Sequence, residues 1–478
     1  MPTVADTRAP ASAESPLVAA VEGTFGGTSL ASSDAYRRLL GAGVPTQKDE
    51  AFRYVSLRRL RGDAFRIFSG SPARVRDAPP LSFPGLEGRR VTLVNGRHSE
   101  GLSTLVRPAS GFSWIDAEDA ADFGTDQDGC DFFSDLNGLV APPLFHIDVP
   151  PGTRVEEPVH LVLRSASSGE AVSVVCARVL VTVGEGASLD LVTTTDGVGP
   201  GRYLADHHLR FELAPDSTVR HFNYHGDPDD SFFFHLTEAE LRERSSYSSF
   251  HLAFGGHLSR VRHRIELVGE GASAALSGAE VLGDDREHHK HIVVHHRAPA
   301  CRSHQHFKTI LGQNAVTSYD GAIVVEPVAQ KTDAYQLGAN LVLSDTARAH
   351  VKPALYIGAD DVKCSHGATV GQIEEEELLY VRSRGIPLAE ARRMLVFGFA
   401  GEVLEAIDLP SVRAEFECLV GLRLAGVDRP AEKAEGAAGT CRATGDGRRA
   451  TEPPNPEPRT PSPGRGGSSP PPDKGTPS

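Results

Sequence analysis

Long apolar runs are absent from this 478-residue sequence, and none approaches the roughly 18 residues needed to span a bilayer. The N-terminus also lacks the basic start and apolar stretch of a secretory signal. We therefore expect a cytoplasmic protein that makes no membrane contact. Basic residues are outnumbered by acidic ones, 49 to 63, and no basic stripe offsets the net charge of −14. Such a surface repels phosphate backbones, so nucleic acid is excluded as a partner.

Cysteine is scarce, and its six residues form no CxxC pair. This arrangement argues against a self-contained zinc site and against a disulfide framework. A thiol with a chemical role would act singly or with a ligand from elsewhere. The motifs GxxxxGK[ST], GxSxG and HExxH are missing too, as is a GxGxxG that follows a strand. We therefore expect no ATP hydrolysis by this chain.

Large apolar side chains disappear after Val427, and 11 of the 33 prolines lie beyond it. Such a segment cannot bury enough apolar surface to offset the entropy that it would lose on ordering. Residues 427–478 are therefore predicted to be a disordered tail.

The N-terminal region, residues 1–89, is predicted to be helical. Asp34 follows a serine pair and precedes a helical spacing of apolar residues, which is typical of a capped helix start. A second helical segment is expected over residues 47–60. Gly, Pro, Asp and Ser interrupt the pattern between residues 70 and 143, which predicts short strands and loops there.

The central region, residues 90–372, is dominated by short segments in which apolar and polar residues alternate, the pattern of half-buried strands. Similar turn phrases recur at steps of 30, 28, 27 and 28 residues, anchored on Ala187, Ser217, Ser245, Ala272 and Ala300. Later anchors at Ala315, Ala347 and Val362 fall at about half that step or a little over it. A fixed period with strands in each repeat favours a solenoid, here a parallel β-helix. A β-sandwich with coincidentally spaced turns is the alternative.

Residues 373–426 are predicted to form a small C-terminal helical domain. Four acids, Glu374 to Glu377, begin a first helix that ends at Gly385, Pro387 begins a second, and Asp408 with Pro410 begin a third. The second helix carries an apolar stripe and further apolar residues beside it, which leaves burial against the solenoid and partner binding equally open. The candidate partner-binding residues are Leu388, Leu395, Phe399 and Val403.

Cys364 and His366 form the strongest candidate chemical site. Two positions apart on a strand, they share one face, roughly 7 Å apart at the backbone. Thiolate and imidazole suit iron or zinc, and Lys363 is expected to favour the thiolate. Two ligands do not complete a tetrahedral site, so a second surface would have to supply the rest. On spacing alone, a structural cysteine beside a hydrogen-bonded histidine is the favoured interpretation.

A second cluster places seven histidines in nineteen residues: His288, His289, His291, His295, His296, His304 and His306. No carboxylate or thiolate lies at a typical ligand spacing among them, so a metal site is disfavoured. We interpret the cluster as polar filling on the solenoid exterior or as a proton-sensitive patch.

Several segments resemble the SufB/SufD family of iron–sulfur cluster assembly proteins closely. They are QKTDAYQ (330–336), NLVLS (340–344), DDVKCSHGATVG (360–371), LLYVRSRGI (378–386), EAR (390–392) and FGFA (397–400). The likeness is clear over about residues 260–407. Upstream, KDEAFRY (48–54) resembles the family's degenerate early motif.

The resemblance implies a right-handed parallel β-helix between helical ends. It also implies a non-catalytic scaffold subunit in a complex with a SufB-like subunit and a SufC-like ABC-type ATPase, which would dock on about residues 374–407. The cofactor implied is a transient iron–sulfur cluster shared with the partner. A reduced flavin in the complex and a homodimer of the isolated chain are left open.

Two departures from the SufB-like pattern point to the SufD-like branch. Gly338 aligns with a SufB cysteine, and Gly367 stands where SufB-like chains have glutamate. The resemblance therefore implies that this chain does not hold a nascent cluster alone, and that Cys364 and His366 face the SufB-like partner. The rival functions are a β-helix enzyme acting on polysaccharide, a metal-dependent enzyme built on the histidine cluster, and a purely structural partner of SufB.

Overall fold

The computed structural model describes residues 15–68, 83, 85–105, 112–117, 131–140 and 143–427. All of them belong to one compact unit, residues 1–441; a second unit, residues 442–478, contains no described residue. The predicted tail therefore lies outside the described residues, apart from Val427.

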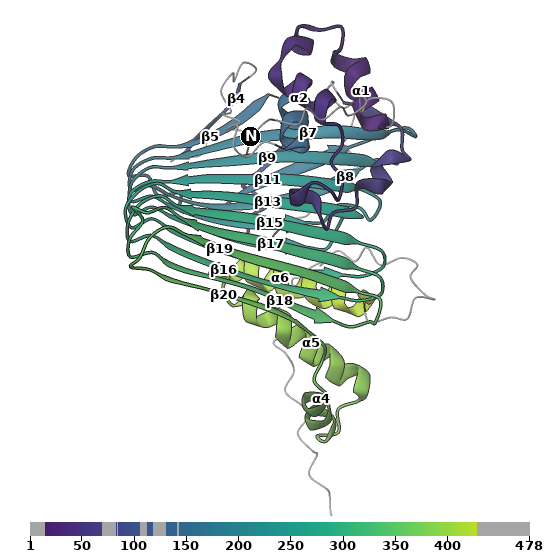
Figure 1. The fold of residues 1–478 in the computed structure, drawn as a ribbon, viewed down its shortest axis with the longest axis vertical. Helices are drawn as coiled ribbons and strands as arrows, with labels where there is room; N and C mark the ends of the chain where they lie inside the picture. The colour runs from purple at the N-terminus through teal and green to yellow at the C-terminus, as the bar shows by residue number, and fades with distance from the viewer. Residues whose placement is uncertain are drawn as a thin grey trace, which may run out of the picture. The chain divides into compact units, whose positions relative to one another are not determined.

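Two long sheets run through the described part of the chain, each a ladder of mostly parallel strands (Figure 1). In hydrogen-bonded order, sheet A contains β19 (Arg348–Ile357), β17 (Val316–Val325), β15 (Glu287–His296), β13 (Leu258–Leu267), β11 (Phe232–Leu241), β9 (Tyr203–Leu213), β7 (Val172–Val183), β5 (Leu144–Val149) and β4 (Ser113–Ala117), with β1 (Phe65–Ile67) also paired to β7. Sheet B contains β20 (Lys363–Gly371), β18 (Asp333–Val342), β16 (Arg302–Leu311), β14 (Ser273–Leu282), β12 (Ser246–Ala253), β10 (Thr218–His225), β8 (Ser188–Val198), β6 (Val159–Ala166), β2 (Arg90–Val94) and β3 (Arg97–His98).

The predicted β-solenoid is confirmed, with about eight turns. Along sheet B, Ser188 pairs with Thr218, Thr218 with Ser246, Ser246 with Ser273, and Ser273 with Arg302, which are steps of 30, 28, 27 and 29 residues. Each coil contributes one strand to each sheet, so turns that precede strands of opposite sheets lie half a period apart. This explains the half-steps of the sequence pattern, and the parallel pairing is inconsistent with a β-sandwich.

Alternate residues of both sheets point into the solenoid and stack, coil upon coil, into apolar ladders. One ladder joins Val181, Phe211, Ala239 and Ile265, all at most 1% exposed. Such stacking supplies each coil with the apolar cover that it cannot provide for itself.

The N-terminal region forms α1 (Pro16–Phe25), the 3₁₀ turns η2 (Ser29–Ser32), η3 (Glu50–Phe52) and η4 (Leu57–Arg61), and α2 (Asp34–Ala42). The predicted helix start at Asp34 is confirmed, because the Ser33 side chain accepts a hydrogen bond from the Tyr36 amide at 3.2 Å. The predicted helix over residues 47–60 is wrong. Its buried residues, Phe52, Val55, Leu57 and Leu60, pack against the solenoid, and the segment breaks into two short 3₁₀ turns.

One helix lies where only strands and loops were expected. In α3 (Phe132–Val140), the Asp131 carboxylate accepts hydrogen bonds from the amides of Phe133 and Ser134, each at 3.1 Å. The apolar spacing of Phe132, Phe133, Leu136 and Leu139 packs this helix on the outer face of sheet A.

The C-terminal region forms α4 (Glu375–Arg382), α5 (Leu388–Leu404) and α6 (Pro410–Val427), so the three predicted helices are confirmed. Helices α5 and α6 cover the outer face of sheet B, where Phe416 packs with Phe222 and Phe250. None of the α4 residues is buried. The domain boundaries themselves remain predictions.

Two further findings concern the helices. Cys418 of α6 is disulfide-bonded, whereas Cys176, Cys301 and Cys364 are free thiols. Among the described helices, none is long and apolar enough to cross a membrane.

Candidate functional site at the open end of the solenoid

The solenoid ends in two strands that each have one unpaired edge within the described chain. Strand β19 is the last strand of sheet A, and strand β20 is the last strand of sheet B. Within the described ranges, no further coil covers their inner side chains. The inward-pointing Ile357 and Val370 are therefore 43% and 55% exposed, whereas Val325, the neighbour of Ile357 one coil earlier, is 2% exposed.

Cys364 and His366 lie on the inward face of β20 at this end. They pair in register with Ala334 and Gln336, whose side chains are buried inside the preceding coil. Cys364 is half-buried and His366 is exposed. The structure thus places both side chains on one face and opens that face to an approaching surface. Their role as metal ligands remains a prediction.

The Cys364 thiol rests partly in the core, against Leu355 and the cluster that includes Val325 and Ala334. Partial burial raises its pKa, the carboxylate of Asp333 adds to this, and a hydrogen bond with the Ala334 backbone opposes it. The expectation that Lys363 promotes the thiolate is wrong, because Lys363 points outward on the opposite face of the strand and is exposed. The raised pKa keeps Cys364 in its thiol form at neutral pH.

Polar side chains line the inside of the coils directly behind this pair, a feature that strand alternation did not reveal. The Tyr319 hydroxyl donates to Gln305 Oε1 at 2.8 Å. Gln336 Oε1 and Gln305 Nε2 are buried and have no hydrogen-bond partner among the described residues. Unpaired buried polar atoms are costly, so the lining behind the pair is polar and incompletely hydrogen-bonded among the described residues.

One coil further in, a fully buried ion pair joins Lys290 of β15 to Glu280 of β14. Burial by itself raises the pKa of Glu280, but Lys290 and His288 outweigh it and hold that pKa well below its usual range. His288 Nδ1 lies 3.7 Å from the Glu280 carboxylate. The solenoid interior is therefore charged as well as apolar.

The histidine cluster is split between faces. His288 and His296 point into the core and are at most 1% exposed, so the exterior placement predicted for them is wrong. The rest lie on outer faces: His289, His291 and His295 on sheet A, and His304 and His306 on sheet B. Among the described residues, no group of three His, Cys, Asp or Glu side chains is arranged to hold a metal ion.

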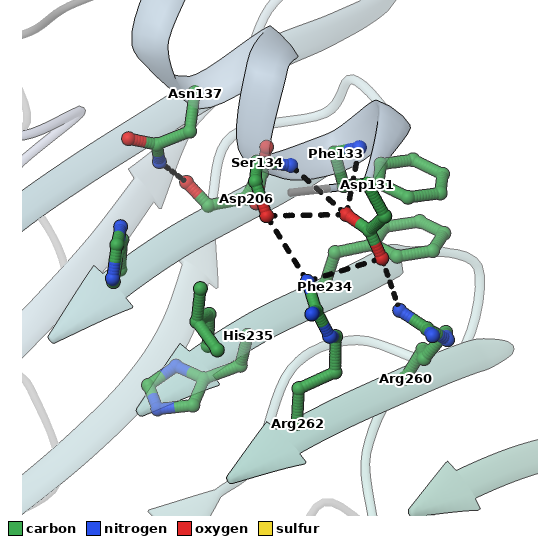
Figure 2. Close-up of a pocket in the computed structure, with 11 residues that line it drawn as sticks. Asp131, Phe133, Ser134, Asn137, Asp206, Phe234, His235, Arg260 and Arg262 are labelled. Carbon is green, nitrogen blue, oxygen red and sulfur yellow. Dashed lines mark hydrogen bonds and ion pairs between the residues drawn. The ribbon is translucent and has the colours of Figure 1, made fainter. Parts of the chain in front are cut away.

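A small pocket lies between α3 and the outer face of sheet A (Figure 2). Asp131 pairs with Arg260 at 2.6 Å and with Arg262 at 3.2 Å, and Asn137 donates to the Asp206 carbonyl at 2.7 Å. Burial first, and Asp131 second, raise the pKa of Asp206. The free volume of about 10 Å³ has room for about one water, so the network fixes α3 to the sheet and leaves no space for a substrate.

The four candidate partner-binding residues of α5 differ in exposure. Leu388 is 46% exposed, Leu395 and Phe399 are half-buried, and Val403 is fully buried against sheet B. Val403 therefore packs within this chain. The exposed apolar side chains nearby are Leu379 and Tyr380 on α4, and Leu388, Met394 and Phe397 on α5.

The two glycines that separate this chain from the SufB-like pattern face opposite ways. Gly338 points inward, and a Cβ there would lie 3.2 Å from Tyr319 Cδ1. Gly367 points outward, and a Cβ there would lie 2.9 Å from Leu337 Cδ1. A side chain at position 338 would therefore crowd the lining behind Cys364 and His366.

Comparison with known proteins identifies the family. The model described as "SUF system FeS cluster assembly, SufBD core domain" matches residues 164–399. The chain belongs to the SufB/SufD family. It is similar to the iron–sulfur cluster assembly protein SufD of Escherichia coli, at 29% identity over 82% of this chain and 92% of that protein.

Two further relatives agree with this assignment. An iron–sulfur cluster assembly SufBD family protein of Synechocystis sp. is 28% identical over 80% of this chain and 87% of its own length. The chloroplastic protein ABCI7 of Arabidopsis thaliana is 29% identical over 78% and 82%. The chain is an iron–sulfur cluster assembly protein of the SufBD type.

Proposed function

We propose that this chain is a non-catalytic scaffold subunit on which iron–sulfur clusters are assembled and transferred in the cytoplasm. It would act with a SufB-like subunit and a SufC-like ABC-type ATPase. The observation that carries this proposal is the placement of Cys364 and His366 on one inward face of the last, uncovered coil. A soft and a borderline ligand are thereby presented together at a surface with room for a partner.

The ligand count requires that partner. A thiolate and an imidazole supply two ligands, whereas iron or zinc in a protein site usually takes four. The SufB-like subunit supplies the remaining ligands, and the cluster or its iron and sulfide are cargo shared across the junction. A reduced flavin in the complex remains a prediction without a supporting observation.

The partner docks on the open end. The free edges of β19 and β20 present unpaired backbone groups, and Ile357 and Val370 are inward side chains without a covering coil. Another β-solenoid of the same family has matching strand edges and a matching apolar interior. Without that partner, a second copy of this chain would occupy the same surface and form a homodimer.

The ATPase docks on the exposed apolar residues of α4 and α5. Leu379 and Tyr380 are 66% and 60% exposed, and Met394 of α5 is 51% exposed. Exposed apolar side chains that gather on neighbouring helices are typical of a protein interface. Because α5 also packs on β14 and β16, movement of the bound ATPase would reach the strands next to β18 and β20.

The test is cluster formation by the purified complex with Cys364→Ala or His366→Ala. We expect the complex to assemble normally and to lose most of its capacity to form clusters under anaerobic reconstitution. Ser365→Ala is the matched control, because Ser365 lies between the two residues and points outward. Normal cluster formation by both alanine variants would remove these residues from the mechanism.

A purely structural role is the second candidate, and one observation favours it. The Cys364 thiol packs against the core and its pKa is raised, as in an inert buried cysteine. Under this alternative, Cys364→Ala destabilises the last coil and weakens the complex, but clusters form at the normal yield per assembled complex.

A further inference from the structure

The early motif that resembles the SufB/SufD family, residues 48–54, packs against β19, the last strand of sheet A. The two segments are far apart in the sequence. The Glu50 carboxylate accepts a hydrogen bond from Lys352 Nζ of β19 at 2.9 Å, across a separation of 302 residues. Two positions away on the same strand, the His350 ring stacks on Tyr54, with centroids 4.7 Å apart and planes inclined by 14°. The assembly role described above uses neither contact.

The residues between these two contacts are anchored to the middle of the sheet. Phe52 is 2% exposed, and the Arg260 guanidinium lies 4.1 Å from the centre of its ring. Arg260, on β13, also donates to the Ala51 carbonyl at 3.3 Å and is paired with Asp131. Residues 50–54 therefore bridge a firmly buried network on β13 and the terminal strand β19.

Strand β19 needs such support more than the strands before it. It has a neighbour within its sheet on one side only, β17, and no described coil covers its inner face. Its residues are half-buried or exposed throughout, whereas those of β17 alternate between buried and half-buried. Strands with few buried contacts and exposed backbone hydrogen bonds open locally at low free-energy cost.

We propose that residues 50–54 form a clamp that positions β19 for pairing with the partner subunit. Glu50 and Tyr54 are its positioning residues, and Phe52 with Arg260 is its anchor. The pairing of β19 with a partner subunit rests on the proposed function. The clamp that holds β19 in place does not.

The exposure of the clamp contacts separates this role from general stabilisation. The Glu50 side chain is 83% exposed and that of Lys352 is 34% exposed. Ion pairs this open to solvent contribute little to global stability. Removing the contacts should therefore leave the fold intact and change only the strand that they touch.

The test uses the full chain with Glu50→Gln and Tyr54→Ala, singly and together, and measures amide hydrogen exchange peptide by peptide. We expect exchange in residues 348–357 to be about tenfold faster in the double variant, because an aromatic contact and a charged hydrogen bond are lost. Exchange in β13 and the melting temperature should stay the same. Asp34→Asn is the control, since the Asp34–Arg37 pair is also exposed to solvent but lies away from β19.

Binding to a SufB-like subunit is then measured for the same variants, and we expect about fivefold weaker affinity in the double variant. Unchanged exchange in β19 overturns the clamp. Faster exchange with unchanged affinity overturns its positioning role. Failure of the unmodified chain to bind any SufB-like subunit counts against the proposed function, and the exchange result still decides the clamp.

Discussion

Lys308 on the outer face of β16 donates a hydrogen bond to the Glu402 carboxylate of α5 at 2.5 Å, and its ammonium group lies 4.4 Å from the centre of the Phe399 ring. The Lys308 side chain is 5% exposed, whereas that of Glu402 is 65% exposed. This pair is a direct polar link between the helix proposed to dock the ATPase and the sheet that ends in Cys364 and His366.

Lys308→Met should uncouple helix α5 from sheet B without unfolding the chain. Methionine keeps most of the apolar stem, and a partner as exposed as Glu402 limits the loss to about 1 kcal/mol in the free energy of unfolding. We expect ATPase binding to be retained and ATP-dependent cluster formation to fall. The measurement compares ATPase affinity with cluster yield, and Arg413→Met, which breaks the Arg413–Glu417 pair within α6, is the control. Parallel loss of binding and yield would argue against a coupling role.

The buried pair of Lys290 and Glu280 should be sensitive to the loss of either partner. Glu280→Gln leaves the Lys290 ammonium without its counter-ion inside the core, next to Thr309 at 3.2 Å. We expect a loss of about 3–5 kcal/mol, measured by urea unfolding. Replacing both residues, Glu280→Leu with Lys290→Met, should cost less than the single change, because no uncompensated charge remains. A single variant as stable as the parent would show that water reaches the pair.

Stability should fall in mild acid because of buried imidazoles. Burial lowers the pKa of His160 and of His221 to about 3, with further lowering by Arg90 and by His263 respectively. The unfolded pKa is about 6.5, so below that pH the unfolded chain binds protons that the folded chain does not. The contribution of these histidines to the free energy of unfolding is therefore fully present above about pH 6.5. It falls as the pH drops toward their pKa in the folded state, and the loss is about 2 kcal/mol per histidine at pH 5.

Urea unfolding between pH 7.5 and pH 5 measures this slope, and His221→Asn should reduce it. Tyr247→Phe is the matched control, because it removes the hydroxyl that lies 3.0 Å from His221 Nδ1 and keeps the imidazole. It should lower stability at every pH and leave the slope unchanged. An unchanged slope in His221→Asn would show that the folded protein protonates this ring.

The solenoid could be predicted from the sequence because the spacing of turns before Ser188, Thr218 and Ser246 is the spacing of the coils themselves. The polar interior could not. Strand β15 reads EHHKHIVVHH, with polar residues on both faces of its first half, and alternation alone does not tell which face is inward. Only the register with Thr317 and Tyr319 of β17 places His288 and Lys290 inside.

In the N-terminal part of the chain, the local sequence pattern predicted the wrong conformation for one segment and missed one helix. Phe52 and Tyr54 were assigned to a helix, but one side chain is buried under Arg260 and the other stacks on His350. Contacts made hundreds of residues away decide the conformation there, which no local pattern reveals. Helix α3 did carry a signal, because Asp131 precedes a helical spacing of Phe132, Phe133 and Leu136.

Replacing Gly338 with cysteine and Gly367 with glutamate should not enable this chain to hold a cluster by itself. The first position faces inward and the second outward, so a thiolate at 338 and a carboxylate at 367 do not share a metal ion. Gly338→Cys should cost about 1–3 kcal/mol, because the nearby Tyr319 ring is held by its hydrogen bond to Gln305. Gly367→Glu should cost less, since the atom nearest to the new Cβ is the mobile end of Leu337. Anaerobic reconstitution of the double variant should give no iron–sulfur absorbance, and a stable cluster that requires both new side chains would contradict the assignment of the two positions to opposite faces.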